Sequence, residues 1–241
     1  IYGVTGTTHL LDLVSPGGAV PSSWDEVLRW DGSGPLLLAG MTFLIVGFGF
    51  KIAVFPLHMW APDTYQGAPT PISAFLITGS EAAAFAAIMR VFLGGLPFLS
   101  ETTSPALAAL AAVTMTFGNV TAIVQTNIKR MMAYSAIAQA GYVLVGVAVN
   151  TPDSVAAALY YLLVYAFMTI GAFGVIILVS RNLQGDLIEH YKGLSQASPL
   201  AAAALSVFFI SLIGIPPTAG FFGKFSLFKA AVGAVTYGSP C

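Results

Sequence analysis

Lys51, Pro56 and His58 lie close together in a long apolar run of this sequence. A lysine in such a run is costly in a bilayer unless it faces a partner or a wet cavity. A proline frees backbone groups that neighbouring atoms must satisfy. We therefore predict a broken helix in which Lys51 is a protonatable group of a hydrated channel. Alternatively, Lys51 could extend to the membrane interface. We favour the channel, because Pro56 interrupts the run while the chain stays apolar to Trp60.

Glu81 and Lys224 are two further charged residues inside apolar runs. Glu81 lies near the middle of its run, where it could pair with a lysine or form an ordinary interhelical hydrogen bond. Lys224 follows Pro216-Pro217 in a glycine-rich, aromatic segment, which favours a lysine that faces a cavity. We predict that Lys51, Glu81 and Lys224 belong to one proton pathway.

His58 titrates near neutral pH and could pass protons between Lys51 and the cytoplasmic side. It could equally cap free carbonyl groups at the interface. The polar segment Asp63–Pro71 is interpreted as a structural turn. Other polar residues could line a water path, although we favour ordinary interhelical hydrogen bonds for them: Gln125, Thr126, Ser135, Gln139, Tyr161, Tyr165 and Thr169.

Composition indicates a membrane protein. Of 241 residues, 57% are hydrophobic and 8% are charged, whereas soluble domains have about 25% charged residues. So few charges could not give a soluble protein an adequate polar surface. The net charge of −1 and the lack of a basic stripe argue against nucleic-acid binding. We predict an all-α polytopic membrane protein with a single membrane domain over residues 1–241.

Six apolar runs are each close to the length of about 20 residues that a helix needs to cross a bilayer. Their approximate bounds are 35–59, 71–93, 105–125, 131–149, 154–180 and 199–230. The last run is too long for one crossing, and Pro216-Pro217 divides it. The bias of Lys and Arg between the loops places those with Asp63, Lys129 and Arg181 on the cytoplasmic side.

The first and last runs share one feature. Each combines a lysine with helix-breaking proline: Lys51 with Pro56, and Lys224 with Pro216-Pro217. Equivalent helices at this spacing suggest repeats of five helices, and an odd number of helices inverts one repeat relative to the other. We predict inverted five-helix repeats and two proline-broken helices, with charged residues that meet near the midplane.

Cofactor motifs are missing from the sequence. It has no Walker A loop and no dinucleotide fingerprint, and Cys241 is its single cysteine. One cysteine allows neither an internal disulfide nor a cysteine metal cluster. We therefore expect no redox centre in this chain. Because the sequence begins with Ile1 and not with Met, we also expect it to be a segment of a longer protein.

Three segments resemble the antiporter-like membrane subunits of respiratory complex I: Phe50–Pro71, Gly118–Tyr142 and Gly214–Phe225. The resemblance implies a proton-translocating subunit of an NADH:quinone oxidoreductase, with Lys51 and Lys224 as the lysines of the two broken helices. It implies a multi-pass protein of the bacterial inner (plasma) membrane whose partners are the other membrane subunits, especially further antiporter-like ones. Flavin, iron–sulfur clusters and quinone would be bound by other subunits.

Two features depart from that family. The glutamate that usually pairs with the lysine at Lys51 would lie before Ile1. At Glu81 the family more commonly has a lysine, whereas here the sequence is Ser80-Glu81-Ala82. We expect Glu81 to act in the relay as an acid, because a carboxylate between two lysines can still pass protons if it can be protonated.

Two other functions fit the same pattern of lysines. One is a cation/proton antiporter subunit, and the other is a non-pumping structural membrane subunit of a hydrogenase-type complex. The turn at Gly67–Pro71 favours the complex I subunit.

Overall fold

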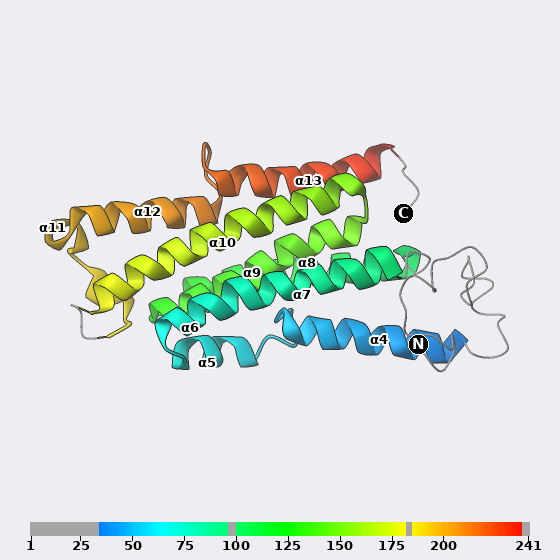
Figure 1. Cartoon of the computed structure of the whole chain (residues 1–241), viewed down its shortest axis with the longest axis horizontal. Coiled ribbons are helices and arrows are strands. Elements are labelled where there is room, and N and C mark those ends of the chain that lie inside the picture. Colours follow the sequence, from blue (N-terminus) through cyan, green and yellow to red (C-terminus); the bar gives the residue numbers. More distant parts are fainter. Residues whose placement is uncertain (1–33, 96–99, 182–184, 238–241) are drawn as a thin grey trace.

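The computed structural model describes residues 34–95, 100–181 and 185–237. Within these ranges the regular elements are helices, and an isolated β-bridge joins Asn127 to Leu187. The long helices lie side by side in an elongated bundle (Figure 1). By length and composition, four are suited to cross a membrane: Thr70–Leu93, Thr103–Ile123, Ile128–Val149 and Pro152–Ser180. The predicted all-α membrane class is confirmed.

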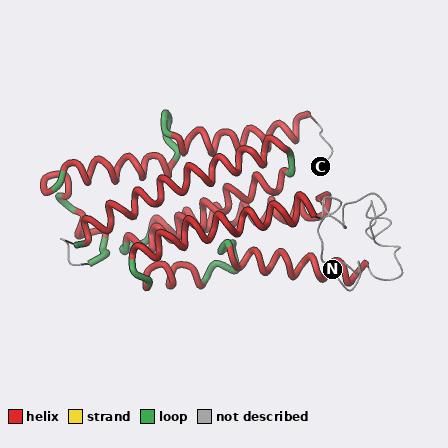
Figure 2. Tube along the Cα trace, viewed as in Figure 1, coloured by secondary structure: helices red, strands yellow, loops and turns green. Residues whose placement is uncertain are grey.

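The first apolar run is interrupted in its final part. Helix α4 spans Gly34–Lys51, residues 52–59 are irregular, and helix α5 spans Trp60–Gly67. Pro56 lies inside the interruption, in a cis peptide bond. Figure 2 shows the interruption as a loop between two helical segments. The chain is therefore helical up to Lys51 and continues, after the interruption, as a short second helix.

Backbone groups at the end of α4 have partners. Ala53 has a φ of 54°, the left-handed conformation that often ends helices. Its amide donates to the Phe50 carbonyl at 3.2 Å, and the Val54 amide donates to the Gly49 carbonyl at 2.9 Å. The indole N–H of Trp60 also donates to the Phe50 carbonyl, at 2.8 Å. Because these carbonyls are satisfied, the helix can end in apolar surroundings.

The second run is one long helix with two widened turns. It comprises α6 (Thr70–Phe75), the π-helical segment η1 (Leu76–Ser80), α7 (Glu81–Met89) and the π-helical segment η2 (Arg90–Gly95). Such π-helical turns are rare in proteins overall. Where they do occur, they are often part of a functional site. Glu81 directly follows the first of them.

Helices α8 (Ser100–Ile123) and α9 (Ile128–Val149) pack closely against each other. Asn127 begins α9, because its side chain accepts hydrogen bonds from two backbone amides of the first turn. A Cβ atom on Gly118 would lie 2.7 Å from the backbone nitrogen of Ala138. The close approach of the two helices therefore requires a glycine at this position.

Helix α10 (Pro152–Ser180) is the central element of the bundle, since it packs against α6, α9 and both halves of the last run. Thr151 and Ser154 form a capping box at its start. Two short elements follow it, the 3₁₀ segment η4 (Ile188–Tyr191) and helix α11 (Leu194–Ala197).

The last run is divided at its prolines, as predicted. Helix α12 (Pro199–Ile213) ends at Gly214, whose φ is 89°, and α13 (Ala219–Tyr237) begins after Pro216-Pro217. Figure 1 shows α12 and α13 running along the bundle in the direction opposite to α4 and α5. The two proline-broken helices are thus confirmed, and their opposite directions fit inverted repeats.

Candidate functional site

Glu81 is a buried acid between two parts of the bundle. It is 3% exposed and lies on α7 directly after the π-helical turn. The hydroxyl group of Tyr65, on α5, donates a hydrogen bond of 3.2 Å to its Oε1 atom. Tyr65 is itself 2% exposed. A tyrosine on the first broken helix therefore holds this carboxyl group away from bulk solvent.

Lys51 differs from the prediction in its burial. The sequence indicates a lysine deep in apolar surroundings, whereas the side chain is exposed in the described part of the chain. The reason is that α4 lies at the outer edge of the bundle, with the other helices on one side of it (Figure 1). Lys51 nevertheless lies within electrostatic range of Glu81.

Lys224 caps the end of the preceding half-helix. Its Nζ atom donates to the carbonyl groups of Leu212, at 2.8 Å, and of Ile213, at 3.3 Å. It also lies 4.2 Å from the centroid of the Tyr142 ring, a cation–π contact. The carboxyl end of α12 carries a partial negative charge, which stabilises the ammonium group. Lys224 is thus held where α12 ends.

A polar bridge connects Lys224 to α10. The side chain of Gln139, on α9, donates to the same Leu212 carbonyl at 3.2 Å. The hydroxyl group of Tyr161, on α10, donates to Oε1 of Gln139. Gln139 and Tyr161 are both buried. For these two residues the sequence favoured interhelical hydrogen bonds, and the structure shows that those bonds lead to Lys224.

Tyr165, one turn from Tyr161, extends this arrangement towards Glu81. The rings of Tyr161 and Tyr165 stack, with centroids 6.4 Å apart, and Tyr165 lies within electrostatic range of Glu81. The buried hydroxyl groups of Tyr165 and Thr169 are neighbours, yet neither forms a well-aligned hydrogen bond within the described ranges. A buried hydroxyl group without a partner costs free energy. The Tyr165 hydroxyl group is therefore a donor that the carboxyl group of Glu81 could satisfy.

A cavity of about 510 Å³ opens onto Lys224. Its polar lining consists of Asn119, Ser135, Gln139 and Tyr142, and the Asn119 amide donates to the Tyr142 hydroxyl group at 3.0 Å. A cavity with several polar groups is suited to hold water. The geometry fits the predicted lysine that faces a cavity.

His58 lies apart from the polar bridge. It is 6% exposed, and its ring packs against Phe55 and Phe117, with centroids at 5.6 and 4.5 Å. Its Nδ1 atom has no hydrogen-bond partner among the described residues. The structure therefore places His58 among aromatic rings, and Nδ1 caps no described carbonyl group.

A group of polar residues fixes α5 to the start of α9, and we call it the outer clamp: Asp63, Gln66, Lys129, Arg130 and Asp186. Arg130 donates to Asp63 at 2.7 Å and to Gln66 at 3.0 Å. Lys129 donates to the Ala68 carbonyl at 2.8 Å and lies 3.6 Å from Asp186. Because α5 also carries Tyr65, the outer clamp sets the position of the hydroxyl group that binds Glu81.

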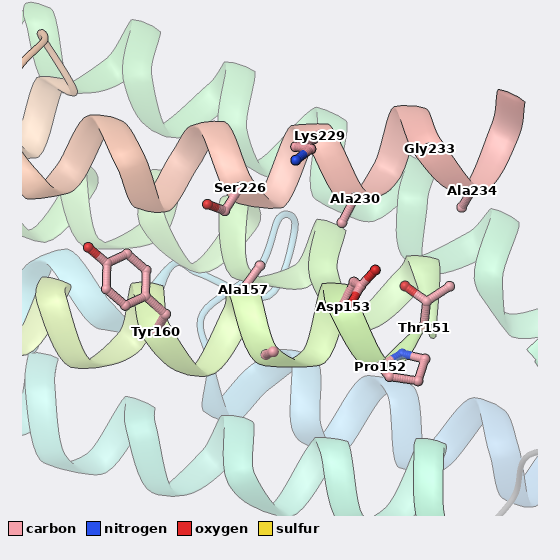
Figure 3. Close-up of a pocket in the computed structure, with 11 residues that line it drawn as sticks. Thr151, Pro152, Asp153, Ala157, Tyr160, Ser226, Lys229, Ala230, Gly233 and Ala234 are labelled. Atoms are coloured by element: carbon pink, nitrogen blue, oxygen red, sulfur yellow. The ribbon is translucent and has the colours of Figure 1, made fainter. Parts of the chain in front are cut away.

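A larger groove, of about 820 Å³, lies between α10 and α13. Figure 3 shows Asp153, Tyr160, Ser226 and Lys229 along it, and small residues such as Ala157 and Gly233 also line it. Its lining includes neither Glu81 nor Lys224. The groove is therefore separate from the polar bridge.

Tyr65 is the site residue that the sequence interpretation missed. It falls in the segment Asp63–Pro71, which was interpreted as a structural turn, whereas residues 60–67 form helix α5. The available signal was a large aromatic residue within a polar segment. Its partner could not be inferred, because Glu81 is reached only through the fold.

Two proline-broken helices around a buried acid and a lysine at a half-helix end define an antiporter-like membrane bundle. The family model described as "NADH:quinone oxidoreductase/Mrp antiporter, TM" matches residues 1–238. The chain belongs to this family, so the resemblance noted from the sequence is confirmed.

Similar proteins are named as subunits of one enzyme. The chain is 50% identical over 239 residues to NADH-quinone oxidoreductase subunit N 2 of Symbiobacterium thermophilum, covering 96% of this chain and 46% of that protein. It is 47% identical over 232 residues to subunit N of Desulforamulus reducens, again covering 96% of this chain and 46% of that protein. The chain thus spans about half the length of the curated relatives it matches.

Solved structures with the same fold belong to two kinds of complex. A chain of respiratory complex I from Thermus thermophilus matches with a TM-score of 0.74 and 37% identity, over 97% of this chain and 47% of that chain. A chain of the Mrp complex from a Dietzia species matches with a TM-score of 0.81 and 27% identity, over 98% of this chain and 42% of that chain. The antiporter-like fold is therefore confirmed.

Proposed function

We propose that the chain is part of a proton-translocating membrane subunit of an NADH:quinone oxidoreductase. Protons move along Lys51, Glu81 and Lys224, and electron transfer in other subunits drives them. The observation that carries this proposal is the polar bridge from Lys224 through Gln139 to Tyr161. Tyr165, which stacks on Tyr161, lies within electrostatic range of the buried Glu81. The curated relatives named above are subunits of that enzyme.

Glu81 is suited to a relay because its surroundings can support either protonation state. A buried carboxylate needs a hydrogen-bond donor and a nearby positive charge. Tyr65 supplies the donor and Lys51 lies within electrostatic range. Hydrogen bonds that form in both protonation states allow a proton to come and go without rearrangement of the backbone.

Lys51 needs a cover on its exposed side if it works at membrane depth. Since the chain spans about half of its relatives, the rest of the full-length subunit is the source of that cover in this proposal. The resemblance assigns a glutamate from the preceding helices to this role. His58 is kept as a secondary candidate on the cytoplasmic side, because an imidazole that lacks a partner at Nδ1 can accept or donate a proton.

The proposal is tested in the complete enzyme in membrane vesicles. The variants are Lys51→Ala, Glu81→Gln and Lys224→Ala, and the ratio of protons taken up to NADH oxidised is measured. We expect each variant to lower that ratio at least severalfold while quinone reduction is partly retained. The matched control is Lys229→Ala, because Lys229 is an exposed lysine on the same helix as Lys224.

Full proton uptake in both the Lys51→Ala and Lys224→Ala enzymes would contradict the proposal. That outcome would instead favour a non-pumping structural subunit. In the proposed function the chain itself carries no redox group. Flavin, iron–sulfur clusters and quinone are bound by partner subunits, the further antiporter-like subunits adjoin it in the bilayer, and the complex lies in the bacterial inner membrane.

A second candidate is a cation/proton antiporter subunit, because the fold also matches a chain of the Mrp complex. The lower identity to that chain, 27%, makes this candidate the weaker one. Purification of the native complex separates the two. Co-purified flavin and iron–sulfur clusters support the oxidoreductase, whereas sodium-dependent proton exchange without them supports the antiporter.

A further inference from the structure

We propose that Tyr65 and Tyr165 are positioning residues for Glu81. Tyr65 holds the carboxyl group on the side of Lys51, and Tyr165 binds it on the side of Lys224. This inference rests on the proposed function and deepens it, because it assigns two positions to the acid at the centre of the relay. Both tyrosines keep their own protons and only donate hydrogen bonds.

The first position is the one observed. Tyr65 and Glu81 are buried, and a hydrogen bond joins the two side chains. At 3.2 Å it is longer than the usual range of about 2.5–3.0 Å for an O–H···O bond. A bond of this length fixes a direction for the carboxyl group and is weak enough to be exchanged.

The second position is indicated by an unused donor. The Tyr165 hydroxyl group is fully buried without a well-aligned partner, and it lies within electrostatic range of both Glu81 and Tyr65. Buried hydroxyl groups in proteins nearly always have a partner. A carboxyl group that turns from Tyr65 to Tyr165 supplies that partner.

The two tyrosines connect to different lysines of the relay. Tyr65 is on α5, which continues the chain from Lys51 across the first break. Tyr165 stacks on Tyr161, whose hydroxyl group leads through Gln139 to Lys224. When the protonated carboxyl group of Glu81 turns from Tyr65 to Tyr165, it therefore carries its proton from the side of Lys51 to the side of Lys224.

The backbone before Glu81 favours such an exchange. The π-helical turn at Leu76–Ser80 replaces ordinary helical hydrogen bonds directly before this residue. Widened turns of this kind are frequent at functional sites. On the other side the outer clamp holds α5, so Glu81 moves while Tyr65 stays in place.

The test uses the complete enzyme and infrared difference spectra between acidic and alkaline pH. The carbonyl band of protonated Glu81 is identified by its loss in Glu81→Gln. In Tyr65→Phe we expect this band to shift to higher wavenumber, since the carbonyl group loses a donor, and the proton-to-NADH ratio to fall severalfold. In Tyr165→Phe we expect an unshifted band and the same fall in the ratio. Tyr191→Phe, which removes a buried hydroxyl group elsewhere, is the matched control and changes neither.

An unshifted Glu81 band in Tyr65→Phe would overturn the positioning role even if pumping falls, and normal pumping in Tyr165→Phe would overturn the second position. If Tyr65→Phe does not assemble, ring-fluorinated tyrosine at this position preserves the shape and strengthens the donor, so the band must shift to lower wavenumber. Normal pumping in Glu81→Gln would instead remove the proposed relay and leave the infrared result intact. The two failures are therefore distinguishable.

Discussion

Lys224 and Gln139 donate hydrogen bonds to one and the same carbonyl oxygen, that of Leu212, at 2.8 and 3.2 Å. This carbonyl is free because α12 ends at Ile213. The interruption of the helix thus creates the acceptor that joins a lysine on α13 to an amide on α9. The break in the helix thus supplies a free backbone acceptor as well as a bend.

Replacing Gln139 by Leu removes the amide that donates to the Leu212 carbonyl and leaves Lys224 bound to it. The Tyr161 hydroxyl group then loses its partner, which costs about 1–3 kcal/mol for a buried group. We expect a lower thermal midpoint of the complex and a severalfold loss of proton uptake per NADH. Gln125→Leu is the control, since the described hydrogen bond of the Gln125 side chain goes to the nearby Thr121 carbonyl, close to the end of α8. Equal effects of the two variants would argue against the polar bridge.

Gly223 allows α13 to approach α10. A Cβ atom there would lie 2.5 Å from Cδ2 of the buried Tyr161 ring. Overpacking of this kind typically costs about 1–3 kcal/mol, so we expect Gly223→Ala to lower the thermal midpoint and weaken the bridge to Lys224. Gly233→Ala meets no atom within 4 Å and should be silent in the same thermal unfolding measurement.

The two cations of the outer clamp, Lys129 and Arg130, should contribute differently to the stability of the protein. Lys129 is 6% exposed and donates to the Ala68 carbonyl at the end of α5, whereas Asp63, the partner of Arg130, has a side chain 74% exposed. We expect Lys129→Ala to destabilise the protein by about 1–3 kcal/mol and Arg130→Ala by less than about 1 kcal/mol. Unfolding in denaturant of the two purified variants provides the comparison, and a larger effect of Arg130→Ala would contradict it.

Because of Tyr191, we expect the stability of the protein to depend on pH in the alkaline range. Burial, and then the nearby Asp186, raise the pKa of its hydroxyl group to about 12, whereas an unfolded tyrosine ionises near about 10. Its contribution to stability is therefore complete below about pH 10 and is lost as the pH rises through about 12. The thermal midpoint of the wild type should fall more steeply over this window than that of Tyr191→Phe. Parallel curves would show that the hydroxyl group is not buried in the assembled protein.

The sequence by itself determined the class of fold and the places where helices break. So few charges in so long an apolar chain require a bilayer, and prolines at 56 and 216–217 cannot continue a helix without loss of backbone hydrogen bonds. It also identified the costly residues, Lys51, Glu81 and Lys224, because a charge in an apolar run is visible without any knowledge of its neighbours.

Only the tertiary structure decided which groups surround those charges. Tyr65 meets Glu81 across 16 positions, and Gln139 meets the Leu212 carbonyl across 73. Such contacts depend on how helices pack, on glycines such as Gly223 and on the exact residue where a half-helix ends. The burial of Lys51 likewise depends on which helices cover α4, and its own run of residues does not carry that information. The local sequence shows that a charged residue lies in an apolar run and is costly to bury. The groups that stabilise it come from distant parts of the chain and are known only from the tertiary structure.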